Sequence, residues 1–217
     1  MTFDWNVLRA NWPSFAHGMW VTFTIAILSM AVALVVGLAL ALMRASSSRP
    51  LRAVDQVYIE IFRALPLYVF LLWAYYGLKI ALNLGVGDIA TVVATLGLVT
   101  AAYMAEIYRS GLLAVHREQV QAGHAVGLST PQIYAHIVVP QMTRIILPAT
   151  VNQFVGVLKG ATIAGIIGVA DVMYFARTST VQTYQPFEYY TIAGVMLILG
   201  TLLFALLGSY LETRYRW

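Results

Sequence analysis

A few charged side chains stand inside long apolar stretches of this sequence. Lys159 lies deep within residues 145–169, and Glu60 precedes Arg63 by one helical turn within another such stretch. A charge at mid-membrane depth costs roughly 3 kcal/mol, so it pairs, reaches the interface or faces a water-filled pathway. For Lys159 the sequence leaves three partners open. They are the carboxylate of a small molecule, the interface reached by snorkelling, and an acid, either Asp171 or one on a second subunit.

Motifs of the common catalytic sites do not occur in the sequence. There is no GxxxxGK[ST] phosphate loop, no HExxH zinc motif and no GxSxG nucleophile elbow. The histidines His17, His116, His124 and His136 have no spacing that gathers metal ligands, and cysteine is absent. We therefore expect no catalytic residue, no metal site and no cofactor in this chain, and no enzymatic activity of its own.

The elements that position these charges are expected to be membrane-spanning helices. Hydrophobic residues make up 60% of the chain and charged residues 10%, which is typical of an integral membrane protein. Five apolar stretches reach the length of about 20 residues that a spanning helix needs. They are residues 21–43, 57–82, 89–107, 145–169 and 189–211. Because the short alternating segments of a membrane barrel are missing, we predict an all-α fold in one transmembrane domain over residues 1–217.

Basic residues predict the orientation, because short loops rich in arginine stay in the cytoplasm. Eight arginines fall in three groups on one side, after the first stretch, around the long polar loop and after the last stretch, whereas the opposite loops hold only Lys79 and Arg177. They are Arg44, Arg49 and Arg52; Arg109, Arg117 and Arg144; and Arg214 and Arg216. The sequence thus predicts an outer N-terminus and an inner C-terminus. This asymmetry also explains the net charge of +4, so we expect no nucleic-acid partner.

Aromatic residues near the ends of the stretches predict contact with membrane lipid. Residues 5–15 fit a helix lying at the outer interface, and a belt of rings is expected at the same level. The belt residues are Tyr75, Tyr76, Tyr184, Phe187, Tyr189 and Tyr190. Tyr210, Tyr215 and Trp217 are expected to anchor the last helix at the inner interface.

The polar segment at about residues 112–144 interrupts this apolar pattern. Gln121-Ala122-Gly123 is followed by Gly127 and later by Pro140, which resembles the cytoplasmic coupling loop of ABC importer permeases. Three further segments are similar to permeases that import polar amino acids. They are Tyr58-Ile59-Glu60-Ile61-Phe62-Arg63 with Pro66 and Leu67; Ala101-Ala102-Tyr103 with Glu106, Arg109 and Gly111; and Asn152-Gln153-Phe154 with Leu158 and Lys159.

This resemblance implies a type I ABC importer permease with five transmembrane helices, which moves a polar amino acid while a partner subunit hydrolyses ATP. It implies three partners: a cytoplasmic ABC ATPase dimer carrying ATP and Mg, a second permease subunit, and an external substrate-binding protein. It places the chain in the bacterial inner membrane. The implied ATPase-coupling residues are Gln121, Ala122, Gly123, His124, Gly127, Leu128 and Ser129, and the implied substrate-pathway residues are Asn152, Gln153, Lys159 and Thr162.

Several roles stay open from the sequence. Glu60 with Arg63, and Glu106 with Arg109, are expected to form structural pairs on one helix face, with a direct transport role as the alternative. A smooth face of glycines, Gly156, Gly160, Gly165 and Gly168, is expected to pack against a second subunit. Gly160 and Ala161 replace the Asp-Thr usual in the family, which favours an opine or a compatible solute as alternative cargo. The rival class is a membrane scaffold or channel subunit that transports nothing by alternating access.

Overall fold

The computed structural model describes residues 5–215, apart from the side chains of Trp5, Asn6, Leu8, Leu211, Glu212, Arg214 and Tyr215. All regular elements in this range are helical. They are α1 (Trp5–Ala45), α2 (Arg49–Ala64), α3 (Leu67–Leu72), η1 (Trp73–Ile80), α4 (Asp88–Ala114), α5 (Arg117–Ala125), α6 (Thr130–Ile133), η2 (Tyr134–Val138), α7 (Val139–Ala161), η3 (Thr162–Ile167), α8 (Val172–Thr183) and α9 (Pro186–Tyr215). The expected inner anchors Arg214, Tyr215, Arg216 and Trp217 lie outside the described residues or side chains.

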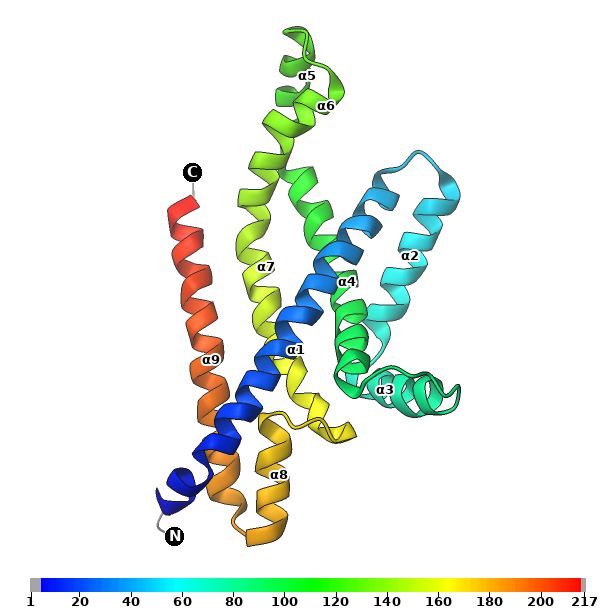
Figure 1. Ribbon diagram of the computed structural model, residues 1–217. Coiled ribbons are helices and arrows are strands. Elements are labelled where there is room, and N and C mark those ends of the chain that lie inside the picture. Colours follow the sequence, from blue (N-terminus) through cyan, green and yellow to red (C-terminus); the bar gives the residue numbers. More distant parts are fainter. Residues whose placement is uncertain (1–4, 216–217) are drawn as a thin grey trace.

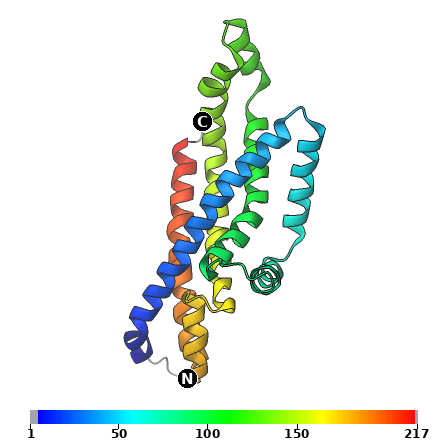
Figure 2. The same cartoon turned by 45° about the vertical axis from the view of Figure 1, so that its right-hand side comes forward.

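Long helices form an elongated bundle in which α1 runs obliquely across α4 and α7 (Figure 1). The helix α9 lies beside α7, and α5 with α6 projects at one end of the bundle (Figure 2). The N-terminus and α8 lie at the other end (Figure 1). One apolar core joins α1, α4 and α7, with the fully buried side chains of Ile25, Met104 and Leu158 at its centre. The bundle thus has two distinct ends, one of which carries the polar loop.

Among residues 5–215, four helical segments are long and apolar enough to cross a membrane, which makes this a multi-pass membrane protein. They are Arg9–Ala45, Asp88–Ala114, Thr130–Ile167 and Pro186–Tyr210. The helix α1 has 41 residues and is therefore about 60 Å long, twice the thickness of the hydrocarbon core. Helix α1 runs obliquely to the other long helices (Figure 1), and a tilted helix fits a longer apolar stretch into the same hydrocarbon thickness. The fourth stretch starts earlier than expected, because helix continues from Thr130 without a break.

The expected span over residues 57–82 is not one continuous helix. Helix α2 ends at Ala64, and the helix formed by α3 and η1 leaves it at an angle of 103°. The break follows from Pro66, whose ring excludes the helical conformation for the preceding residue. Leu65 is accordingly extended, with φ −76° and ψ 126°. The second expected span is therefore a bent pair of helices, and the described chain has five spans only if this pair counts as one.

Glycines on α1 and α4 make a close contact between these two helices. A Cβ atom on Gly37 would lie 2.7 Å from Met104 Cβ and 3.0 Å from the Ala101 carbonyl oxygen. On the partner helix, a Cβ atom on Gly97 would lie 2.8 Å from Val32 Cβ. Small residues allow such backbone approach, which is how helices associate in a membrane without a hydrophobic driving force.

The first residues do not form a separate interfacial helix. They belong to α1, which is continuous through Pro13. Phe15 is fully buried and stacks on Tyr189 of α9, with ring centroids 6.2 Å apart. The Tyr189 hydroxyl also accepts a hydrogen bond from Asn11 Nδ2 at 3.2 Å. Tyr189 therefore belongs to the packing of α1 on α9 and not to a lipid-facing belt, whereas Tyr184 is 88% exposed.

A buried carboxylate begins α8. Asp171 is the N-cap residue, and its Oδ1 accepts a hydrogen bond from the Tyr174 backbone N–H at 2.7 Å. The side chain is fully buried, and Oδ2 has no hydrogen-bond partner among the described residues. Burial raises the pKa of Asp171 to about 6, although backbone N–H groups and Arg177 oppose the shift. Between about pH 4 and pH 6 the folded protein therefore holds a proton here that the unfolded chain releases.

We expect the unfolding free energy to rise by about 2 kcal/mol at this site as pH falls from 7.5 to 4. The sign follows because a raised folded pKa makes the folded state bind more protons than the unfolded state between pH 4 and pH 6. Asp171→Asn keeps the cap and removes this contribution. Thermal unfolding in detergent at several pH values, for both proteins, isolates the difference. A wild-type pH profile identical to that of Asp171→Asn would contradict the assignment.

Candidate functional site

The polar loop folds into a compact knob formed by α5, α6 and η2, and its first helix ends at a glycine. Gly127 has φ +83°, which is the left-handed conformation that glycine adopts without a Cβ clash. Its N–H donates to His124 O and the Leu128 N–H donates to Gly123 O, both at 3.0 Å. These two bonds define a Schellman motif, which satisfies the last carbonyl groups of α5. The end of α5 is therefore fixed by the backbone itself.

A small apolar core holds the two arms of the knob together. Gly123 is buried, and a Cβ atom there would lie 2.9 Å from Ile133 Cγ1. Around this contact, Val115, Ile133 and Val138 are buried and Leu128 packs against them. The second arm begins with a capping box, in which the Ser129 backbone N–H donates to Gln132 Oε1 at 2.9 Å. The knob can therefore move as one body with α7, because η2 leads directly into that helix.

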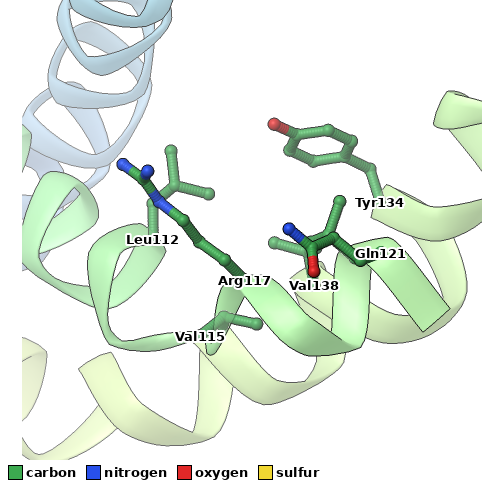
Figure 3. Close-up of a pocket in the computed structure, with 7 residues that line it drawn as sticks. Leu112, Val115, Arg117, Gln121, Tyr134 and Val138 are labelled. Atoms are coloured by element: carbon green, nitrogen blue, oxygen red, sulfur yellow. The ribbon is translucent and has the colours of Figure 1, made fainter. Parts of the chain in front are cut away.

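The expected ATPase-coupling residues divide between the surface and the interior of this knob. Five of them are exposed: Gln121, Ala122, His124, Gly127 and Ser129. Gly123 is buried and Leu128 is half-buried, so these two position the others. A cleft of about 330 Å³ opens where α4, α5 and η2 meet. Figure 3 shows Arg117, Gln121 and Tyr134 around this cleft.

The expected pathway residues lie on α7 and its continuation. Asn152 and Lys159 are exposed and, being seven residues apart, share one face of the helix with Gly156. Gln153 is half-buried, and Thr162 donates its hydroxyl to Lys159 O at 2.7 Å. Within the described residues no carboxylate lies within ion-pair distance of Lys159, so of the alternatives left open by the sequence the pair with Asp171 does not form. Asp171 caps α8 instead, and the amine stays on an open face.

The four glycines do not form one smooth surface. A Cβ atom on Gly156 would meet nothing within 4 Å, whereas on Gly160 it would touch Leu96 and Leu67 of the same chain. Gly165 packs against Asp171 and Tyr174, and Gly168 ends η3 at φ +90°. The α-helix gives way to a 3₁₀ turn at Thr162–Ile167, so the helical phase that would align them is lost. Gly156 and Gly168 stay open, but they do not lie on one continuous helix face.

One expected ion pair forms and the other does not. Arg109 makes two hydrogen bonds to Glu106 Oε2, at 3.0 Å and 2.7 Å. Glu60 instead accepts from Gln56 Nε2 at 3.0 Å, and Arg63 lies over the Tyr103 ring at 5.4 Å. The prediction of a pair between Glu60 and Arg63 is therefore wrong. Arg63 stands in the last turn of α2, where its side chain reaches α4.

Comparison with known proteins places this arrangement in one family. Residues 33–217 match the family model described as "Binding-protein-dependent transport system inner membrane component". This chain belongs to that family.

Several proteins are similar to this inner membrane component over nearly their whole length. The arginine transport system permease protein ArtQ of Bacillus subtilis (strain 168) is 29% identical, over 100% of this chain and 99% of that protein. The histidine/lysine/arginine/ornithine transport system permease protein HisQ of Escherichia coli (strain K12) is 32% identical, over 92% of each. The crystal structure of an amino acid ABC transporter with histidines shares 33% identity and a TM-score of 0.91, covering 99% of this chain and 100% of that one.

Sequence reasoning missed the most deeply buried charge near the knob end of the inner membrane component. Asp55 of α2 is 1% exposed, and neither of its carboxylate oxygens has a hydrogen-bond partner among the described residues. Its nearest cation is Arg44 of α1, whose Nη1 lies 3.7 Å from Asp55 Oδ2. The signal was available: Asp55 precedes Tyr58 by three residues, and Tyr58 reaches the Leu98 carbonyl of α4 at 2.8 Å. Both side chains therefore face the bundle.

Arg44→Gln is expected to lower the unfolding free energy by about 2 kcal/mol, because it leaves the Asp55 carboxylate buried without a counter-charge. The figure is below that of a fully buried pair because the Arg44 side chain is 41% exposed. Asp55→Asn in the same chain should restore most of the loss. Thermal unfolding of both single variants and the double variant measures this coupling. Additive effects of the two substitutions would show that the pair is not coupled.

Proposed function

We propose that this chain is the membrane subunit of an importer that moves a polar amino acid, or an amino acid derivative, across the bacterial inner membrane. ATP hydrolysis takes place on a separate cytoplasmic ATPase dimer. A second permease subunit completes the pathway, and an external binding protein delivers the cargo. The observation that carries the proposal is the continuity of one helix from the knob, at Thr130, to the face with Asn152 and Lys159.

The mechanism follows from this rigid connection. A partner that grips the exposed face of α5 moves the knob, and the capping box and small core transmit the movement to α7. Two such chains would open and close a pathway between their α7 faces, because a partner that favours one packing over another shifts the population between them. The similar proteins include permeases of an arginine system and of a histidine/lysine/arginine/ornithine system, which supports amino acid cargo.

The orientation is part of the proposal. The knob, the end of α1 with Arg44 and the start of α2 with Arg49 and Arg52 lie at one end of the bundle (Figure 1). Arginine-rich loops favour the cytoplasm, so this arrangement supports an inner knob and an outer N-terminus. ATP is available in the cytoplasm, so the ATPase would contact the knob on that side of the membrane.

Purification of the chain from its native membrane in mild detergent, followed by mass spectrometry, tests the assembly. We expect an ABC ATPase to co-purify, and the complex in proteoliposomes to take up an amino acid presented by the binding protein only with ATP. Recovery of the intact chain without any ATPase, in repeated preparations, would favour the scaffold or channel class instead.

Lys159→Ala is expected to lower uptake of the cargo about tenfold or more, because a hydrogen bond to a charged group contributes roughly 1.5–3 kcal/mol. Lys159→Arg should retain most of the uptake, since it keeps the charge. Ile145→Ala, on the same face but nearer the knob, is the matched control. Equal uptake by Lys159→Ala and the control would show that the amine does not meet cargo.

A further inference from the structure

An apolar groove lies at the knob end of the bundle, where three spanning helices end or begin. It is formed by the last two turns of α1, the last two turns of α4, and η2 with the start of α7, and its volume is about 400 Å³. The lining is almost entirely hydrocarbon: Leu38, Leu42, Leu112, Leu113, Val139 and Met142. Four of these remain largely exposed, with Leu42 at 64% and Leu113 at 65%. The groove has the size of a small-molecule site but offers few polar partners to a soluble ligand.

Two guanidinium groups stand at this otherwise apolar groove. Arg44 of α1 and Arg109 of α4 both line it. Each has an acidic neighbour, but their side chains are still 41% and 44% exposed, so both keep donors free for another group. Tyr134 of η2 also lines the groove, is 45% exposed, and has no hydrogen-bond partner for its hydroxyl among the described residues. The groove therefore combines a hydrocarbon floor with cationic and hydroxyl donors.

We propose that this groove binds one anionic phospholipid, with an acyl chain along the apolar floor and the phosphate at Arg44, Arg109 and the Tyr134 hydroxyl. The two guanidinium groups favour an anionic head group, because basic pockets between helices on the cytoplasmic side bind such lipids. The position of the groove favours a lipid over a soluble ligand, because the lining residues belong to the ends of membrane-spanning segments. The proposal rests on the proposed function only in assigning the lipid to the inner leaflet.

The test uses the purified transporter complex and native mass spectrometry after brief delipidation. The probes are phosphatidylglycerol, phosphatidylcholine with the same acyl chains, and glycerol 3-phosphate, which carries the phosphate without the chains. We expect retained phosphatidylglycerol only. Equal retention of both phospholipids would show that the groove contacts lipid without selecting the head group. Binding of glycerol 3-phosphate would show that it is a site for a free anion. Either result overturns the proposal.

Two matched pairs of variants locate the site. Ala41→Phe places a ring in the groove, whereas Ala39→Phe adds the same ring to an exposed position of α1 outside the lining. Arg109→Gln removes one guanidinium of the groove, whereas Arg49→Gln removes an exposed one elsewhere. We expect phosphatidylglycerol retention to fall about fivefold in Arg109→Gln and to stay unchanged in Arg49→Gln. Equal losses within either pair would overturn the proposal.

A measurement on the unchanged protein covers the case in which a variant fails to fold. Phosphatidylglycerol with a photoactivatable acyl chain should crosslink to the peptide that contains Leu112 and Leu113. Crosslinks spread evenly over all lipid-facing peptides, or a groove occupied by a segment of the ATPase, would overturn the proposal. ATP-dependent uptake measured on the same preparation separates the two hypotheses, because uptake without specific lipid retention rejects the lipid site and leaves the importer intact.

Discussion

Gly127→Pro is expected to abolish the stimulation of ATPase activity by cargo in the assembled transporter. Proline fixes φ near −65°, whereas Gly127 requires φ +83°. The substitution also removes the N–H that donates to His124 O, so the Schellman motif cannot form. The end of α5 then points elsewhere, and a displacement of about 1 Å can cost roughly a hundredfold in a positioned reaction. We expect cargo-stimulated ATP hydrolysis to fall at least about tenfold.

Gly127→Asn is the matched control, because asparagine tolerates the left-handed conformation and keeps the N–H. It should retain most of the stimulated activity. Both variants should insert in the membrane and co-purify with the second permease subunit, since Gly127 is exposed and a Cβ atom there meets nothing within 4 Å. Stimulated activity in Gly127→Pro at the level of the unchanged protein would show that the geometry of the knob does not transmit force.

Gly37→Val is expected to destabilise the bundle by about 3 kcal/mol or more, the upper range for overpacking. The new side chain would meet Met104 Cβ and the backbone of Ala101 and Ala105, at 2.7–3.2 Å from its first carbon alone. Backbone atoms of a packed helix cannot move aside as the end of a flexible side chain can. The helices α1 and α4 must separate, and the contact that Gly97 makes with Val32 is lost with them.

Thermal unfolding in detergent measures this effect. Gly194→Val is the control, since it adds the same side chain to a helix of the same bundle where a Cβ atom meets nothing within 4 Å. We expect a fall in the melting temperature of several degrees for Gly37→Val beyond that of the control. Equal melting temperatures would mean that α1 and α4 are not held at this distance in the membrane.

The helices and the knob could be predicted from the sequence because each depends on local features. Apolar stretches of the right length became the spanning helices α1, α4, α7 and α9. Gly127 and the Ser129 to Gln132 pair mark a helix end and a helix start, and the backbone makes those structures there. Such signals act over four or five residues and need no distant partner.

The wrong predictions concern side chains whose partners come from distant parts of the chain. The spacing of Glu60 and Arg63 permits an ion pair, but the Arg63 guanidinium, at the end of α2, lies over the Tyr103 ring of α4. Residue spacing along Asn152 to Gly168 predicts one smooth face only if the α-helix continues, and it ends at Ala161. Tyr189 is of a residue type that is common in aromatic belts, but its ring points into the bundle and stacks on Phe15.

By itself, the sequence determined an all-α, multi-pass membrane protein with a polar knob, and a family whose model covers residues 33–217. Tertiary structure alone decided the angle of 103° between the two halves of the second span, the burial of Asp55 beside Arg44, and the position of Lys159 on an open face. Hydropathy and helix-end signals depend only on residues that are close together in the chain, so they can be read from the sequence. Burial of a charge depends on which helices meet, and that is fixed only when α1, α2 and α4 pack together.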